Sequence, residues 1–199
     1  ALNLHTPNGL HVRYLTPEIA RLMKQSRFKT IRLSLESALP DLQEQMDRKI
    51  SNSGYQQGVE ALLSAGYRHQ DFETYLMIGM PGQSLEQVMQ SILFLAERNL
   101  KISLASFSPI PHSPMFRIHP PAGTDPLLHN PTIYHYQTEE IRPIFKKIRN
   151  LVSIINRSVE LECNIFHDRL LKNLIRDIYR HDGDQRIEIP DHSSDSNNV

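Results

Sequence analysis

Two hydrophobic patterns alternate along the first half of the chain. Short apolar or alternating runs of strand length occur at residues 1–5, 29–35, 75–78 and 102–107, and residues at helical spacing follow between them. Strands that alternate with such helices pair in parallel, because a hairpin cannot return the chain in the same direction. The pattern predicts an α/β fold: an incomplete parallel (β/α) barrel of about four strands, TIM-like but partial, followed by a C-terminal helical extension.

Several helices have recognisable first and last residues. Thr16 is a suitable N-cap for the first helix, and Ser84 and Gln87 have the spacing of a capping box. Gly66 is suited to end the helix that carries Tyr55. These local signals predict helices immediately after the turns that they mark.

Two turns contain glycines that suit an unusual backbone conformation or the approach of a ligand. Gly9, in a Thr-Pro-Asn-Gly run, is suited to a positive φ. Residues 79–82 stop the strand at 75–78 with Gly-Met-Pro-Gly, a loop whose backbone N–H and C=O groups can approach a ligand closely. Taken alone, this motif is better explained as a plain turn between a strand and a helix.

The pattern changes after residue 115. Residues 114–131 are rich in Pro and His with little periodicity, which predicts a long loop before two amphipathic helices. The polar tail has too little apolar surface to offset its ordering entropy. We therefore divide the chain into a half barrel at residues 1–115, a loop and helical extension at 116–180, and a disordered tail at 181–199.

Composition and charge narrow the function classes. Hydrophobic residues make up 39% of the chain, which suits a globular core, and 22 basic residues balance 22 acidic ones. A net charge of zero gives nucleic acid little electrostatic attraction. No apolar run approaches the ~18 residues needed to span a bilayer, and no signal-peptide pattern is present. We expect a cytoplasmic protein without a membrane or nucleic-acid partner.

The start of the chain is unusual for this architecture. The sequence begins with Ala1 inside a strand-like run, so the first strand would present an unpaired edge. We therefore expect a piece of something longer. The expected partner is the missing N-terminal half of the same barrel or a complementary subunit.

The chemistry is expected where the strands end. In a parallel barrel, functional groups cluster at the carboxyl ends of the strands. Glu36 and Ser37 suit an ammonium or hydroxyl group, although Glu36 could equally cap the next element or pair with Arg48 or Lys49. The three polar or glycine-rich ends, which we expect to converge on one rim, are residues 34–37, 79–82 and 106–109.

The histidines and the cysteine give no clear metal site. The spacing of His112, His119, His129 and His135 fits neither a helical H-x-x-x-H pair nor a zinc finger, so solvated loop histidines are the simpler interpretation. Cys163 is the single cysteine; it excludes an internal disulfide, and it cannot by itself hold an iron–sulfur cluster. We interpret it as a buried or inert thiol.

Five ordered segments carry a family resemblance. They are TPNGLHVRY at 6–14, IRLSLES at 31–37, MDRKIS at 46–51, IGMPGQS at 78–84 and FSPIP at 107–111. Together they resemble the later part of a radical SAM domain, most closely in the cobalamin-binding-type or methylthiotransferase-like branches. The resemblance covers roughly residues 1–115.

This resemblance implies a partial (β/α)6 barrel with S-adenosylmethionine and a [4Fe–4S] cluster at its carboxyl rim. The strand end near residue 36 resembles the part that meets the methionine or ribose, and Arg48 resembles a carboxylate-binding arginine. The glycine loop and the last strand end resemble the support of the adenine. The implied cofactor-binding residues are Ser34, Glu36, Ser37, Arg48, Ile78, Gly79, Ser108, Pro109 and Ile110.

The chain also departs from the family pattern. The C-x-x-x-C-x-x-C loop that ligates the cluster, the first two strands and the glycine-rich aminoacyl motif are absent. We therefore interpret the chain as part of a radical SAM enzyme whose intact parent cleaves S-adenosylmethionine to a 5′-deoxyadenosyl radical. We assign it no catalytic or metal-binding residue. The alternatives are a non-catalytic remnant that binds a nucleotide or a partner subunit, and an unrelated phosphate-binding barrel.

One prediction follows from the missing cysteines. Anaerobic reconstitution of the purified chain with iron and sulfide should leave it without a cluster chromophore, because the cluster needs several thiolate ligands. The measurement is the visible absorption spectrum after desalting. A brown protein with a sulfur-to-iron charge-transfer band would contradict this account of the missing ligands.

Overall fold

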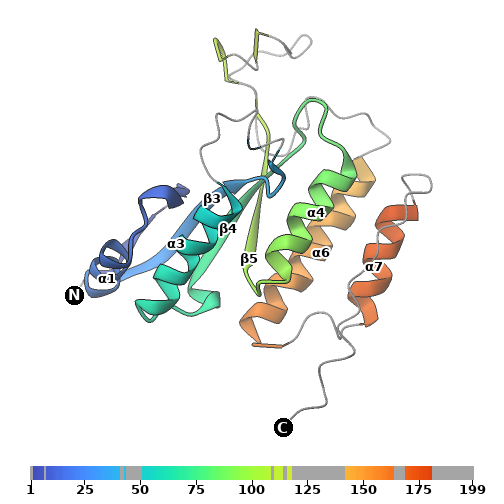
Figure 1. The fold of residues 1–199 in the computed structure, drawn as a ribbon. Coiled ribbons are helices and arrows are strands. Elements are labelled where there is room, and N and C mark those ends of the chain that lie inside the picture. The colour runs from blue at the N-terminus through green and yellow to red at the C-terminus, as the bar shows by residue number, and fades with distance from the viewer. Residues whose placement is uncertain are drawn as a thin grey trace.

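Parallel strands form one open sheet at the centre of the computed structural model, which describes residues 2–6, 8–40, 43, 51–108, 110–113, 116–117, 142–163 and 169–180 (Figure 1). The strands are β1 (Leu4–His5), β2 (Leu10–His11), β3 (Phe28–Glu36), β4 (Phe72–Ile78) and β5 (Lys101–Ser106). The α-helices are α1 (Pro17–Gln25), α3 (Asn52–Ser64), α4 (Leu85–Ala96), α6 (Arg142–Glu160) and α7 (Arg169–Arg180). Two short 3₁₀ helices are η1 (Val12–Tyr14) and η2 (His69–Asp71).

The strand order confirms the predicted fold class. β1, β3, β4 and β5 are neighbours in that order, and every pairing is parallel. β3 and β4 pair with Ser34 opposite Tyr75, and β4 and β5 pair with Ile78 opposite Ser106. The described sheet is not closed and has helices beside it, consistent with a partial α/β barrel.

The predicted first strand, residues 1–5, is present only as the short strand β1, and a second short strand that was not predicted, β2, follows the turn; both pair with β3. Thr6 lies between them and replaces the missing strand contacts. Its N–H donates to the carbonyl of Thr30 at 2.9 Å, and its hydroxyl accepts from the N–H of Arg32 at 3.1 Å. The sheet therefore has five strands where we expected about four, because β2 also pairs with β3.

The helix boundaries follow the local signals in the sequence. Thr16 Oγ1 accepts a hydrogen bond from the N–H of Ile19, at the start of α1. Ser84 and Gln87 form the expected capping box before α4, with bonds of 3.1 and 2.9 Å. Gly66 follows α3 with a φ of 88°. All three predictions are confirmed, since capping depends on neighbours within a few residues.

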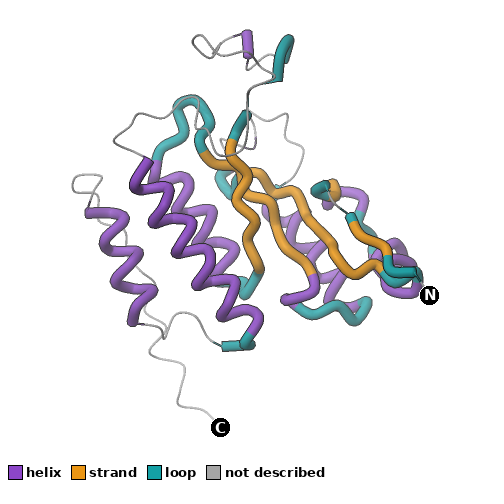
Figure 2. The backbone as a smooth tube through the Cα atoms, turned by 180° about the vertical axis from the view of Figure 1, so that it is seen from behind, coloured by secondary structure: helices purple, strands orange, loops and turns teal. Residues whose placement is uncertain are grey.

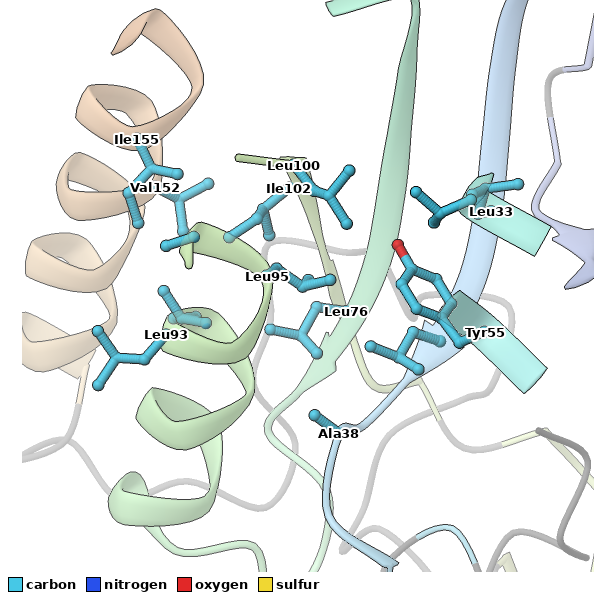
Figure 3. Packing of buried hydrophobic residues seen from close by; sticks show 14 of the residues in the cluster. Leu33, Ala38, Tyr55, Leu76, Leu93, Leu95, Leu100, Ile102, Val152 and Ile155 are labelled. Atoms are coloured by element: carbon cyan, nitrogen blue, oxygen red, sulfur yellow. The ribbon is translucent and has the colours of Figure 1, made fainter. Parts of the chain in front are cut away.

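The helices lie on one side of the sheet and share one hydrophobic core with it. In Figure 2 the strands lie in front, with helices behind and beside them. Figure 3 shows side chains from the strands, including Leu76 and Ile102, meeting Leu95 of α4 and Ile155 of α6. Residues of α7 belong to the same cluster. The C-terminal helices thus pack on the core, while the domain boundary at residue 115 stays a prediction.

Helix α6 covers the outer edge of β5. The side chain of Asn156 pairs with both backbone groups of Ile102: its Oδ1 accepts from the N–H at 2.7 Å, and its Nδ2 donates to the carbonyl at 2.8 Å. Lys101 and Glu160 form an ion pair of 2.7 Å nearby. A carboxamide thus takes the place of the next strand and blocks part of an edge that could otherwise pair with another chain.

Some expectations fall outside the described residues or need correction. The tail at 181–199, nearly all of the loop at 114–131, and His119, His129 and His135 lie outside them. Cys163 is exposed and follows the C-terminal end of α6, so the thiol is not buried; that it is inert stays a prediction. Among the described helices, none combines the length and apolarity needed to cross a membrane.

A buried hydrogen bond joins α3 to the centre of the sheet. Tyr55 and Thr74 are both fully buried, and their hydroxyl groups are hydrogen-bonded to each other. The ring of Tyr55 also lies 6.4 Å from that of Phe94 in α4. Burial raises the pKa of Tyr55 well above its ordinary value of 10.0, because the phenolate would lose its hydration.

Tyr55→Phe is expected to lower the free energy of unfolding by about 1–2 kcal/mol, because the hydroxyl of Thr74 loses its buried partner. In the wild type, Tyr55 contributes its full stability below pH 10 and loses it as the pH rises further, since the exposed phenol ionises first in the unfolded chain. Urea unfolding between pH 7 and 11 measures both effects. Tyr14→Phe, at a 65% exposed position, is the control; an equal loss in both variants would contradict the prediction.

Candidate functional site

The carboxyl ends of β3, β4 and β5 lie next to one another at one edge of the sheet. Glu36 at the end of β3 pairs with Leu76, two residues before the end of β4. Ile78 at the end of β4 pairs with Ser106 at the end of β5. Parallel register therefore brings together the three strand ends named from the sequence. Their binding roles stay predictions.

Two polar side chains at the end of β3 have no partner among the residues that the structure describes. Ser34 and Glu36 are half-buried, and neither side chain forms a hydrogen bond or ion pair with another described residue. Glu36 therefore does not act as a cap or pair within the described part of the chain. A hydroxyl group and a carboxylate at a strand end are thus free to contact a ligand.

Ser37, by contrast, is committed to the fold. It is 1% exposed, and its hydroxyl accepts a hydrogen bond from the N–H of Leu39 at 3.1 Å and lies 3.5 Å from the hydroxyl of Ser91. A hydroxyl held in this way closes the turn that follows β3. Its ligand role, implied by the resemblance, stays a prediction.

The glycine loop after β4 is organised by one side chain. Gly79 has a φ of 81°, a conformation that favours glycine. Gln83 Oε1 accepts from the N–H of Gly79 at 2.8 Å and from the N–H of Met80 at 3.3 Å, while its Nε2 donates to the carbonyl of Met77 at 3.1 Å. The loop is thus held in one shape by its own glutamine.

The remaining predicted residues have different surroundings. Ile78 is fully buried, and its carbonyl accepts from the N–H of Phe107 at 2.8 Å. Ser108 is half-buried without a described hydrogen-bond partner, and Ile110 is 70% exposed. Arg48 and Pro109 lie outside the described residues. Of this group, Ser108 offers a free polar side chain at the strand ends.

The sheet face away from the helices carries a polar network. Arg32 Nε lies 2.5 Å from Glu73 Oε1, and its guanidinium lies 5.6 Å from the centre of the Tyr75 ring. The hydrogen bond to Glu73 raises the pKa of Arg32 above its ordinary value. These residues occupy the alternate positions of β3 and β4, opposite to the buried ones. The face beside the strand ends is therefore polar.

Gly9 lies against this face for a reason other than the one expected. Its φ is not positive, so the expected turn conformation is wrong. A Cβ atom at this position would lie 2.1 Å from Ser34 Oγ and 3.1 Å from Cδ2 of Tyr75. The position therefore requires glycine because the chain passes directly over β3 and β4.

Comparison with known proteins bears on this edge of the sheet. Residues 4–95 match the family model of the radical SAM superfamily. No curated protein matches the chain. The match includes β1 to β4 and nearly all of α4, and thus contains Ser34, Glu36 and the glycine loop; it ends before β5. It does not indicate a branch within the radical SAM superfamily.

The iron–sulfur cluster of radical SAM proteins does not fit this chain's own residues. Cys163 is the single cysteine of the 199 residues, and it follows α6 rather than a strand end. Within the described ranges, no group of three or more His, Cys, Asp or Glu side chains is placed to hold a metal ion. No step of the chemistry is therefore assigned to a cluster held by this chain.

Sequence reasoning missed the residues that support the strand ends. Gln83 was predictable in part, because a glutamine directly after Gly-Met-Pro-Gly can reach back to the turn's own backbone. Gln43 and Asn52 bind backbone carbonyls of the turn after β3, but their sequence neighbours give no sign of it. The alternation of polar and apolar residues along β3 was the sequence signal that Arg32 lies on the face of the sheet away from the helices.

Gly9→Ala is expected to lower the free energy of unfolding by about 1–3 kcal/mol, because the added methyl group overlaps Ser34 Oγ. Ser34→Ala removes that oxygen and should recover part of the loss when the two changes are combined. Thermal unfolding of the two single variants and the double variant measures this coupling. Strictly additive effects would contradict the close approach of the two segments.

Proposed function

We propose that this chain forms part of the S-adenosylmethionine site of a radical SAM barrel. The observation that carries the proposal is the presence of uncommitted polar side chains, Ser34, Glu36 and Ser108, at the edge that also has the Gly79 loop. Groups that are not used by the fold are available to a ligand. The family match over residues 4–95 supports S-adenosylmethionine as that ligand.

Each strand end suits a different part of this ligand. The carboxylate of Glu36 can accept hydrogen bonds from an ammonium group or from ribose hydroxyls, and Ser34 can add a hydroxyl beside it. Gly79 leaves room for a flat base, and Ser108 lies at the end of the neighbouring strand. We assign the methionine or ribose part to the end of β3 and the adenine to the ends of β4 and β5.

Two finer assignments rest on the sequence segments alone. Arg48, in the segment MDRKIS, is proposed to bind the carboxylate of S-adenosylmethionine, which a guanidinium can contact through two parallel hydrogen bonds. The five segments also support the cobalamin-binding-type or methylthiotransferase-like branch as the origin of the chain. The substrate of the intact enzyme stays open in either branch.

The chemistry of the intact parent is the reductive cleavage of S-adenosylmethionine to a 5′-deoxyadenosyl radical. The residues of this chain bind and orient the molecule. The buried side chain of Ile78, at the C-terminal end of β4, excludes water from one side of the site. The electron must come from outside the chain, because a single cysteine does not fit a [4Fe–4S] cluster. This chain therefore contributes binding and orientation.

The free edge of the sheet indicates where the remaining half would join. The outer side of β1 and β2 has no strand partner among the described residues, and Leu2 and Leu4 beside it are 87% and 42% exposed. Strand edges with exposed apolar side chains are suited to pairing with another strand. We propose this edge for the N-terminal half of the barrel or a complementary subunit.

The single cysteine also favours a second candidate, a non-catalytic protein that binds a nucleotide. The two functions differ in what the end of β3 recognises. A radical SAM site needs the methionine end of its ligand, whereas a general nucleotide site needs only the base and ribose. ATP therefore serves as the comparison ligand.

Isothermal titration of the purified chain tests the proposal with S-adenosylmethionine and ATP. S-Adenosylmethionine should bind more tightly, and Glu36→Gln should weaken its binding by about tenfold or more, because a charge-assisted hydrogen bond is lost. Glu60→Gln, on the exposed side of α3, is the control and should leave binding unchanged. Equal binding of both ligands would favour the nucleotide-binding alternative, and no binding of either would contradict both.

A further inference from the structure

Glu36 has a backbone conformation that its residue type disfavours. It ends β3 with a φ of 65°, in the left-handed region that normally favours glycine. The pairing with β4 is irregular at the same point, since Ser34 pairs with Tyr75 but Glu36 with Leu76. A bulge of this kind changes the direction of a side chain and is common beside functional sites.

The other positive-φ residues have ordinary explanations. Arg27, Asn99 and Glu162 follow the ends of helices, where a left-handed residue closes the last turn, and His112 lies in a turn. Among the described residues, Glu36 is the non-glycine residue with a positive φ that lies within a strand. Its own side chain makes no described contact that would compensate for the disfavoured conformation. A local backbone bond supplies part of the constraint, since the N–H of Ser37 donates to the carbonyl of Leu35 across Glu36 at 2.7 Å, and the residues that hold this turn in place supply the rest.

Two side-chain amides hold the backbone directly after Glu36. Asn52 Nδ2 donates to the carbonyl of Ala38 at 2.7 Å, and Gln43 Nε2 donates to the carbonyl of Ser37 at 2.8 Å. Gln43 also donates to Oδ1 of Asn52 at 2.8 Å, so the two amides support each other. Both carbonyls after the bulge are thus tied to the start of α3.

Helix α4 holds the same segment from the other side. Ser91 Oγ accepts a hydrogen bond from the N–H of Ala38 at 3.1 Å and donates its own proton to the carbonyl of Gln87 at 3.0 Å. Ser91 and Ala38 are both buried. The exit from β3 is therefore held between two helices by hydrogen bonds that are buried or partly buried.

We propose that Asn52 is a positioning residue that, with Gln43 and Ser91, holds Glu36 in its left-handed conformation and so directs its carboxylate to the ligand. Strain of this kind persists where the surrounding structure imposes it, and it is concentrated at ligand sites. The inference rests on the proposed role of Glu36 in S-adenosylmethionine binding. The constraint itself, however, is measurable without any ligand.

The first experiment is a double-mutant cycle in thermal stability without ligand. Glu36→Gly should raise the melting temperature by about 3 °C in the wild-type background, because glycine adopts this φ without strain. In the Asn52→Ala background the same change should have almost no effect, since the relaxed backbone no longer forces the conformation. An equal rise in both backgrounds would overturn the proposal. If Asn52→Ala does not fold, Gln43→Ala replaces it in the cycle.

The second experiment repeats the cycle with the affinity for S-adenosylmethionine. Asn52→Ala and Glu36→Gly should each weaken binding about tenfold, and the double variant should bind no more weakly than Glu36→Gly, because both act through one carboxylate. If the double variant instead lost affinity by the product of the two single losses, the proposal would be overturned. Asn156→Ala is the matched control, since it removes a carboxamide from the backbone of β5; it should lower stability but leave affinity within twofold.

The two experiments separate the inference from the function on which it rests. If the wild-type chain does not bind S-adenosylmethionine, the proposed function fails, and the stability cycle alone decides whether Asn52 constrains Glu36. If the wild type binds but Asn52→Ala binds equally well, the function stands and the positioning role is wrong. Coupling in both measurements supports the positioning role.

Discussion

The structure depends on pairing the backbone groups that a parallel sheet leaves open where its strands end. A buried N–H or carbonyl without a partner is costly, and the chain has no neighbouring strand to offer at these points. Side-chain amides take that place repeatedly: Gln43 and Asn52 after β3, Gln83 after β4 and Asn156 along β5. Side-chain hydrogen bonds therefore hold the backbone at these points, although irregular loops follow the strands.

The polar groups at the strand ends fall into two kinds, those that the fold uses and those that have no described partner. Ser37 and the N–H of Gly79 are used by the fold, whereas Ser34, Glu36 and Ser108 have no described partner. Because the buried core lies on the helix side, the opposite face of the sheet can remain polar without a loss of packing. Polar side chains that the described part of the fold does not use are thus found at one edge of the sheet, and the apolar core lies on the other face.

Local rules allowed much of the fold to be predicted from the sequence. Strand and helix order, the caps at Thr16 and Ser84 and the glycine after α3 depend on near neighbours, and all agree with the structure. The second short strand, β2, and the role of Gly9 were not predictable, because both depend on contacts with residues of β3 that are distant in the sequence. The amides of Asn52 and Asn156 donate to backbone carbonyls of segments that are distant in the sequence, so no sequence pattern marks them.

The contact between Asn156 and β5 has a consequence for assembly. A sheet can add strands at either border unless one border is closed, and here the carboxamide and the Lys101–Glu160 pair occupy the border beside α6. The opposite border, along β1 and β2, has no comparable cover among the described residues. Among the described residues, the two borders of the sheet therefore differ: side chains of α6 occupy the border at β5, whereas the backbone groups along β1 and β2 have no such cover.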